Sequence, residues 1–251
     1  MAKSDDATAR RPRKPRPLDL LRTIAAVAAI VPGLAAGVAT LAATRDRRRA
    51  INRAIEVWGD LGTRAAGVQL VVEGREHLAL RPAVFVFNHQ SGADPFLLCA
   101  ILRRDFVGVA KAEIRRNPLL GPAFAFADTV SVDRSDHAQA VRALDPAVAT
   151  LRRGLAILIA PEGTRSVGCE VGAFKKGAFR IALAARAPII PIVLHDAGKV
   201  LPRDGWIMRA ATVHVSVLPP IATDAWSLER LDAHVAAVRQ RFLATLERGP
   251  R

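Results

Sequence analysis

Hydrophobic residues occur along this chain as short apolar runs separated by segments with helical spacing. The run Val84–Phe87 consists of β-branched and aromatic residues, a composition typical of a buried strand. Similar runs predict strands at 68–72, 106–110, 129–132, 155–160, 189–194 and 212–218. Periodic apolar residues predict helices at 51–66, 96–102, 114–126, 138–152, 174–185 and 228–246, with the third broken at Asn117–Pro118 and Gly121–Pro122. Strands that alternate with helices indicate an α/β fold with a largely parallel mixed sheet flanked by helices.

The N-terminal part of the chain has a different pattern. Residues 1–17 are polar, basic and rich in proline, which predicts a disordered basic tail. Residues 24–43 form an apolar stretch long enough to cross a hydrocarbon core of about 30 Å. Pro32–Gly33 interrupts this stretch, and arginines flank both ends, which disfavours a simple spanning helix. We therefore expect a re-entrant or surface-lying helical hairpin on the cytoplasmic face of the cell membrane, with a true span as the alternative.

These patterns divide the chain into three parts: the tail at 1–17, a membrane-associating helical region at 18–66, and an α/β domain at 67–251. The chain has 251 residues, of which 51% are hydrophobic, so one domain can bury a sizeable core. The formal net charge of +14 indicates anionic partners such as lipid headgroups, phosphorylated substrates or nucleic acid. Cys99 and Cys169 show no CxxC or metal-ligand spacing, so we expect neither a disulfide nor a metal site.

The polar residues that follow the 84–87 run suggest acid–base chemistry. His89 comes just past the predicted strand, and Asp94 precedes Pro95 at the predicted helix start, where we expect it to be the N-cap. The short loop between them can bring the carboxylate to the imidazole. Such a carboxylate fixes the histidine tautomer and leaves the other ring nitrogen free to accept a proton. A structural histidine and a simple helix cap are the alternative interpretation.

Cations follow three other predicted strands. They are Lys111 after 106–110, Arg134 after 129–132, and Arg165 after 155–160. The carboxyl ends of parallel strands share one edge of a sheet, so these side chains are expected near His89. Gly163 lets the backbone approach an anion, while Thr164 and Ser166 offer hydroxyl donors. The pattern predicts an anion pocket beside the histidine.

At this point the residues resemble a known family. The segment Asn88–Asp94 is similar to the HxxxxD motif of the glycerolipid acyltransferases. Three more blocks resemble that family in the same order: 109–113 with 118–121 and 132–134, then 161–166 with 174–177, then 187–192. Together the blocks span about residues 70–195. A single HxxxxD motif would be a weak signal, but four ordered blocks are specific.

The resemblance implies the glycerolipid acyltransferase fold and the transfer of a fatty acyl group. The donor would be an acyl thioester, acyl-CoA or acyl carrier protein, and the acceptor the free hydroxyl of 1-acylglycerol 3-phosphate, which gives phosphatidic acid. No cofactor and no metal are implied. His89 would be the base and Asp94 would orient it. The resemblance assigns the acceptor phosphate to Lys111, Arg134 and Arg165, a pocket shaped by Glu162, Gly163 and Thr164, and the acyl side to 188–193.

Three alternatives remain at this level. The acceptor could be glycerol 3-phosphate or another lysolipid instead. A nucleic-acid-binding module would explain the charge, but the basic residues are not interleaved with aromatics and tyrosine is absent, so we expect no nucleic acid partner. A non-catalytic protein of the anionic membrane surface would leave the His89 and Asp94 pair without a purpose.

Overall fold

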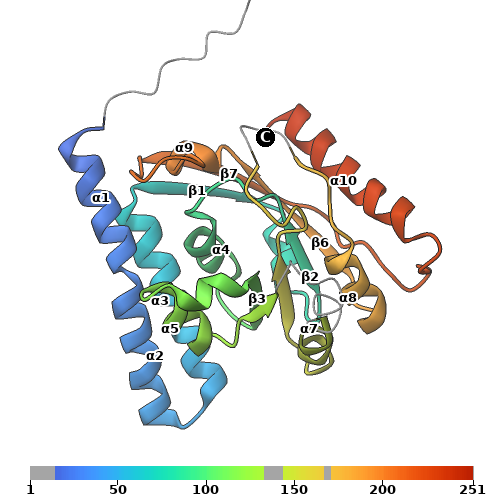
Figure 1. Ribbon diagram of the computed structural model, residues 1–251, viewed down its shortest axis with the longest axis horizontal. Coiled ribbons are helices and arrows are strands. Elements are labelled where there is room, and N and C mark those ends of the chain that lie inside the picture. Colours follow the sequence, from blue (N-terminus) through green and yellow to red (C-terminus); the bar gives the residue numbers. More distant parts are fainter. Residues whose placement is uncertain (1–14, 133–143, 167–170, 251) are drawn as a thin grey trace, which may run out of the picture.

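A seven-stranded mixed sheet forms the centre of the computed structural model, which describes residues 15–132, 144–166 and 171–250 (Figure 1). Its strands are β1 (Val68–Glu73), β2 (Val84–Phe87), β3 (Phe106–Lys111), β4 (Val130–Val132), β5 (Ala156–Ile159), β6 (Ile189–His195) and β7 (Ala211–Val217). They lie in the order β1-β7-β6-β2-β5-β3-β4, and among these neighbours only the β6–β7 pair is antiparallel. The predicted largely parallel mixed sheet is confirmed.

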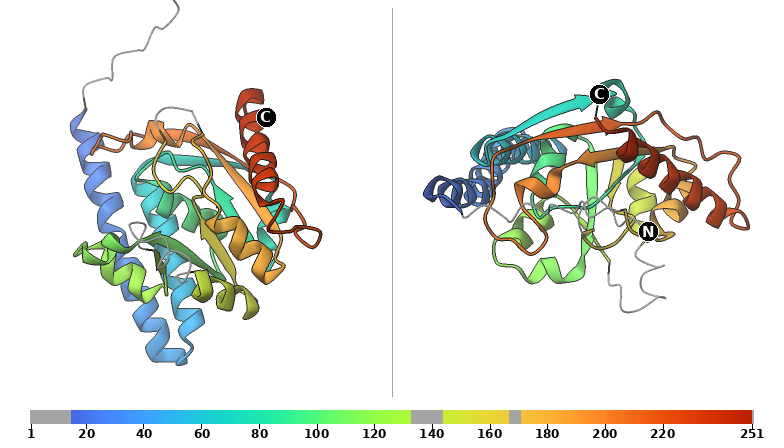
Figure 2. Two further views of the ribbon diagram at one scale, coloured as in Figure 1. Left: turned by 45° about the vertical axis from the view of Figure 1, so that its right-hand side comes forward. Right: turned by 90° about the horizontal axis from the view of Figure 1, so that it is seen from above.

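Helices cover both faces of this sheet (Figures 1 and 2). Alternation along β2 explains why, since Phe85 and Phe87 enter one apolar cluster and Val84 and Val86 enter another. The first cluster is closed by α3 (Arg47–Ala65) and α4 (Asp94–Leu102), and the second by α7 (Leu144–Arg152), α8 (Gly177–Ala185) and α10 (Leu231–Arg248). All four residues of β2 are buried, so the strand before His89 is fixed from both sides.

The N-terminal helices differ from the expected hairpin. The helices α1 (Pro17–Ala28) and α2 (Ile30–Thr44) continue in nearly the same direction, and the chain reverses only before α3 (Figure 1). The interruption lies at Ala29, because Pro32 falls in the first turn of α2, where proline is tolerated. The prediction of a break at Pro32–Gly33 was therefore wrong. Residues 1–14 of the predicted tail lie outside the described part, and Pro17 already begins α1.

Small residues hold α2 against α3. A β-carbon added to Gly33 would come within 2.9 Å of Trp58 Cβ, and one on Gly37 within 2.9 Å of Ala54 Cβ. The two helix backbones therefore approach as closely as they do only because these positions lack side chains. On its other side α3 packs against α4, where Gly59 meets the backbone at Ala100. The apolar N-terminal helices are thus joined to the sheet through α3.

Some predicted helices are shorter than expected. The predicted helix at 114–126 is the 3₁₀ turn η2 (Ala112–Arg116) followed by α5 (Leu120–Phe126). The predicted break at Asn117–Pro118 is confirmed, whereas Gly121–Pro122 lies in the first turn of α5, where proline is tolerated. The helix predicted from residue 174 begins at Gly177, and the final helix begins at Leu231. The start of the predicted 138–152 helix lies outside the described residues. The 3₁₀ turn η1 (Arg75–Ala79) and the short helix α9 (Ala197–Val200) were not expected.

Candidate active site

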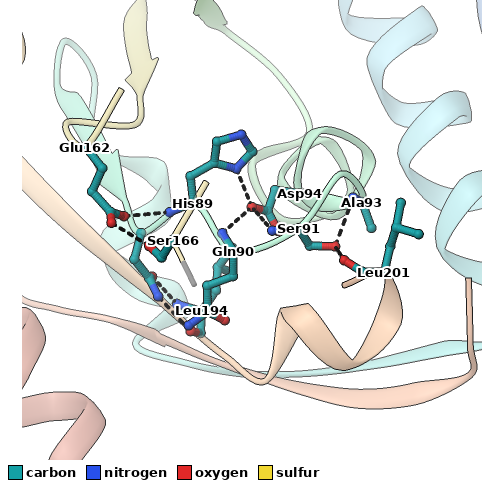
Figure 3. Close-up of polar contacts among 10 residues, drawn as sticks. His89, Gln90, Ser91, Ala93, Asp94, Glu162, Ser166, Leu194 and Leu201 are labelled. Carbon is teal, nitrogen blue, oxygen red and sulfur yellow. Dashed lines mark hydrogen bonds and ion pairs between the residues drawn. The ribbon is translucent and has the colours of Figure 1, made fainter. Parts of the chain in front are cut away.

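The loop that follows β2 brings His89 and Asp94 together. His89 Nδ1 lies 2.6 Å from Asp94 Oδ2 (Figure 3). The Asp94 side chain is fully buried, whereas about a quarter of the His89 side chain is exposed. With the carboxylate ionised, Nδ1 carries the proton and donates it to Asp94, so Nε2 is left as an acceptor on the side of the ring away from Asp94. This is the arrangement of a general base.

Asp94 is not the helix cap that the sequence suggested. Ala93 is the N-cap of α4, and Asp94 is the first helical residue. Its Oδ2 accepts hydrogen bonds from the backbone N–H groups of Gln90 (2.9 Å) and Ser91 (3.0 Å). The carboxylate therefore folds the loop around itself and orients His89 with the same oxygen, which is why the predicted contact forms although the predicted cap does not.

Two further contacts fix the loop to neighbouring segments. The Asn88 side chain exchanges a pair of hydrogen bonds with the backbone of Leu194 in β6, at 2.8 and 3.0 Å. The Ser91 hydroxyl donates to the carbonyl of Leu201 at 2.9 Å. The loop is held on both sides of the histidine, so His89 has a defined position before any substrate arrives. The sequence motif named these loop residues but gave no sign of their partners.

The sequence suggested that Glu162 shapes the anion pocket, whereas the structure places its carboxylate between two loops. It is buried, and its Oε1 accepts a hydrogen bond from the His89 backbone N–H at 2.9 Å. Its Oε2 accepts from the Ser166 hydroxyl (2.5 Å) and from the Gly172 N–H (2.8 Å). The Ser166 N–H in turn donates to the His89 carbonyl (2.7 Å). Glu162 therefore ties the loop after β5 to the loop after β2, and its carboxylate faces these donors.

Arg165 is the predicted anion-binding residue that lies beside the histidine loop. A β-carbon added to Gly92 would be 3.7 Å from Arg165 Nη1. Within the described residues the Arg165 guanidinium makes no hydrogen bond or ion pair. Gly163 adopts φ +74°, a left-handed conformation that glycine accepts without strain, and Thr164 is exposed on the same loop. An unpaired guanidinium next to a general base can bind an anionic group of a substrate.

Of the other two predicted cations, Lys111 lies within the described residues and Arg134 does not. Lys111 is the last residue of β3 and does not follow the strand. Its Nζ forms an exposed ion pair with Glu113 Oε1 at 2.9 Å. Arg134 lies outside the described residues. The structure thus places Arg165 beside His89 and places Lys111 at the carboxyl end of β3, two strands away from β2.

An apolar pocket lies between the N-terminal helices and the sheet. Pro95, next to Asp94, and Cys99 line it from α4. The remaining lining residues come from α2, α3, β3, β5, α5 and the segment that follows α5; they are Ile30, Leu34, Ala54, Ile55, Trp58, Phe106, Gly108, Ala123, Phe124, Phe126, Ala127, Thr129 and Leu158. The predicted acyl side, residues 188–193, is instead mostly the buried strand β6. No local pattern could reveal this pocket, because it assembles segments that are distant in sequence.

Comparison with known proteins identifies the family of this chain. The family model described as Acyltransferase matches residues 69–195, just over half of the chain. This chain belongs to the acyltransferase family. The matched range contains His89, Asp94, Lys111, Arg134 and Glu162–Arg165, and it ends at the last residue of β6.

Individual acyltransferases resemble this chain over most of its length. It is 32% identical over 181 residues to a 1-acyl-sn-glycerol-3-phosphate acyltransferase of Limnanthes alba, which covers 72% of this chain and 64% of that protein. The enzyme of the same name from Pseudomonas aeruginosa is 29% identical, over 70% of this chain and 74% of that protein. The chain thus aligns with slightly less than two thirds of the Limnanthes protein.

A solved structure shares the fold. It is the 1-acyl-sn-glycerophosphate acyltransferase PlsC of Thermotoga maritima, with a TM-score of 0.73 and 27% sequence identity. The alignment covers 89% of this chain and 93% of that one, so it includes N-terminal residues outside the family-model match.

Proposed function

We propose that this acyltransferase transfers a fatty acyl group from an acyl thioester to the free hydroxyl of 1-acylglycerol 3-phosphate, which yields phosphatidic acid. The observation that carries the proposal is the 2.6 Å contact between His89 Nδ1 and buried Asp94, with Arg165 on the adjoining loop, where its guanidinium has no partner among the residues the structure describes. A base and an anion-binding group at one edge are what acylation of a phosphorylated alcohol requires. The names of the similar acyltransferases support the same acceptor.

The chemical step uses His89 twice. Its Nε2 accepts the hydroxyl proton while the hydroxyl oxygen attacks the thioester carbonyl carbon. The tetrahedral intermediate then collapses, the C–S bond breaks, and the departing sulfur receives the proton from the imidazolium. Asp94 stabilises the charged ring between these events. Base and orienting group both come from the chain, so the proposed reaction needs neither a metal nor a tightly bound cofactor.

The acceptor phosphate is assigned to the loop after β5. The planar Arg165 guanidinium can donate to two phosphate oxygens at once, and Gly163 leaves its backbone accessible. Lys111 and Arg134 would add charge at the same edge; Lys111 would first have to leave Glu113, an exposed pair that costs little to break. Glu162 holds this loop against His89, which keeps the anion site and the base in register.

The acyl chain is assigned to the apolar pocket beside α4. Pro95 lines this pocket and directly follows Asp94, so the pocket begins one residue from the catalytic carboxylate. Its lining is apolar apart from Thr129, which suits a hydrocarbon chain. The acyl thioester, whether acyl-CoA or an acyl group carried on acyl carrier protein, would present its carbonyl at the mouth of this pocket near His89.

We assign the protein to an anionic membrane surface on the cytoplasmic side. Residues Pro17–Thr44 form a helical segment long and apolar enough to cross a membrane. However, α2 packs along α3, whose exposed residues include Arg49, Arg53 and Arg64. A spanning α2 would carry these charges into hydrocarbon, at a large free-energy cost. A helix that lies in the interface keeps them in water and leaves both arginine-rich flanks on the same side.

The decisive experiment is an acyl-transfer assay on the purified protein. Oleoyl-CoA would be offered with 1-oleoylglycerol 3-phosphate, glycerol 3-phosphate, or 1-oleoyl lysophosphatidylcholine, and thiol release would be measured together with lipid product. We expect turnover with the lysophosphatidic acid, little with glycerol 3-phosphate, and little with the choline lipid, which lacks a phosphate monoester. Equal rates with the choline lipid would contradict the phosphate assignment, and thiol release without a lipid product would contradict acyl transfer.

A further inference from the structure

A large aromatic side chain is exposed on the segment that joins α9 to β7. Trp206 is 72% exposed, more than any other large hydrophobic residue among those the structure describes. Its segment, residues 201–210, lies against the upper half of α1 (Figures 1 and 2). The Met208 N–H donates to the Thr23 hydroxyl at 2.7 Å, which ties the segment to that helix. An indole exposed to this extent is accessible to a partner outside the chain.

The surface of α1 next to this segment is also apolar. At about 100° per residue, Val27 and Leu20 lie about 40° and 60° around the helix from Thr23, and Ile24 lies about 100° away. These residues belong to an exposed stripe that runs into α2 and consists of Leu20, Leu21, Ile24, Val27, Val31 and Val38. Trp206 is two residues from Met208, so the exposed indole belongs to a segment whose backbone is bonded to the helix that carries this stripe.

The same segment touches the candidate active site at its other end. The Leu201 carbonyl accepts a hydrogen bond from the Ser91 hydroxyl (2.9 Å), inside the histidine loop. Arg203 Nη1 donates to the Arg165 carbonyl at 2.7 Å. Segment 201–210 therefore connects the apolar helix to both loops of the site within a few residues.

We propose that segment 201–210 is a second membrane contact, in which Trp206 inserts into the interface of an anionic bilayer beside α1. The biological purpose of this contact rests on the proposed function, but the vesicle-binding experiment tests the contact independently of acyl transfer. Its occupant is a bilayer because the stripe belongs to a segment apolar enough for a membrane, and because tryptophan prefers the headgroup boundary. Exposed Arg16 and Arg203 flank the apolar surface and suit anionic headgroups.

This contact has a consequence for the site. The Ser91 and Arg165 loops are hydrogen-bonded to the segment that carries the anchor, so docking of Trp206 fixes the site relative to the bilayer plane. A lipid acceptor would then reach His89 from the membrane without the whole molecule having to reorient. Trp206 acts here through the membrane and is an anchoring residue rather than a catalytic one.

The test compares the full-length protein with Trp206→Ala on vesicles of phosphatidylcholine and phosphatidylglycerol. We expect tryptophan emission of the unmodified protein to shift to shorter wavelength and to be quenched by brominated phosphatidylcholine, and we expect Trp206→Ala to lose this response. Vesicle affinity should fall by roughly tenfold, as expected for removal of a partly buried indole. The control is Leu228→Ala, which removes a 65% exposed leucine from the segment before α10, a helix on the opposite side of the molecule from α1 (Figure 1). Its affinity should not change.

Activity measurements with soluble and vesicle-embedded acceptors distinguish membrane anchoring from the chemical step. With a short-chain, water-soluble lysophosphatidic acid, Trp206→Ala should turn over like the unmodified protein, whereas with acceptor embedded in vesicles its KM should rise. Unchanged emission and unchanged vesicle affinity would overturn the membrane contact even if the enzyme is active. Unchanged vesicle binding combined with loss of self-association in sedimentation would instead assign the surface to a second copy of the chain. A protein that binds vesicles through Trp206 but transfers no acyl group would refute the proposed function alone.

Discussion

The backbone N–H of His89 donates a hydrogen bond to the carboxylate of Glu162 at 2.9 Å, so two residues 73 positions apart share one structural unit. Glu162 reaches His89 because β2 and β5 are neighbours in the sheet and both loops leave at the same edge. The motif that contains Glu162 thus holds the motif that contains His89 in position through a hydrogen bond. This contact makes the loop after β5 a support for His89, in addition to the anion-binding role proposed for it.

Replacement of Glu162 should therefore affect stability as well as activity. Glu162→Ala leaves the Gly172 N–H, the His89 N–H and the Ser166 hydroxyl without their acceptor, and bonds of this kind contribute about 1.5–3 kcal/mol each when charged. We expect a loss of about 2–5 kcal/mol in the free energy of unfolding, measured by urea titration. Glu76→Gln, an exposed carboxylate in η1, is the control and should change little. A stable Glu162→Ala protein would contradict the supporting role.

Loss of the base should reduce turnover without unfolding the protein. His89→Ala removes a side chain that is partly exposed, and we expect kcat to fall by roughly 10²–10⁴-fold, the usual span for a positioned base. The measurement is kcat at saturating donor and acceptor. His77→Ala, another partly buried histidine, serves as the control and should keep full activity.

Asp94→Asn should be damaging for a reason other than helix capping. Asp94 Oδ2 accepts two backbone N–H groups in addition to His89, and the substitution removes the charge from a fully buried site. We expect turnover to drop nearly as far as in His89→Ala, together with a lower melting temperature. An enzyme that loses stability but keeps its turnover would show that Asp94 only shapes the loop.

The acceptor site makes a separate kinetic prediction. Arg165→Lys cannot reproduce a planar fork, so it should raise the acceptor KM almost as much as Arg165→Ala, by roughly 10–100-fold. The phosphate charge does not change during acyl transfer, so most of the effect should fall on KM and little on the donor. Arg134→Ala and Lys111→Ala should act in the same direction and more weakly. Arg241→Ala, which changes an exposed residue of α10, is the control and should leave both KM values unchanged. If the Arg165 variants raised the KM of the acyl donor instead, Arg165 would belong to the donor site.

The apolar pocket predicts a change in acyl-chain preference. Ala123 lies in α5 and lines the pocket, whereas Ala125 on the same helix is exposed. Ala123→Phe should fill part of the pocket and favour shorter acyl-CoA substrates, and Ala125→Phe should leave the preference unchanged. The readout is kcat/KM across a series of acyl-CoA chain lengths. The same preference in both variants would place the acyl chain elsewhere.

Cys99 provides a test of burial in that pocket. Burial raises the pKa of the Cys99 thiol to about 12, so the reactive thiolate is absent at neutral pH in the folded protein. In a Cys169→Ser background, we expect no labelling by N-ethylmaleimide until the protein is unfolded. Because the folded-state pKa is raised, the stability linked to the neutral thiol is present below the unfolded value and is lost as pH rises from about 8.5 towards 12. Rapid labelling of the native protein would contradict the burial.

Local sequence was sufficient for the class of fold and for the reacting pair. The buried run at 84–87 is short, β-branched and apolar, so only a central strand accommodates it, and His89 follows within two residues. Asp94 then reaches His89 across a four-residue loop, a contact between residues that are close in the sequence. Of the cations expected at that edge, Arg165 lies beside the histidine loop and Lys111 ends β3, while Arg134 lies outside the described residues.

Tertiary structure decided what those segments touch. Glu162 looked like part of an anion pocket, but its carboxylate accepts one hydrogen bond from the His89 loop and two, from Ser166 and Gly172, within its own segment after β5. Residues 188–193 looked like an acyl wall, yet most of them form a strand buried on both faces, and the apolar pocket formed instead where α2 and α3 meet α4. These outcomes depend on the strand order β6-β2-β5 and on the close approach of α2 to α3. Both are set by burial of apolar surface between segments far apart in the chain, which no local pattern of residues encodes.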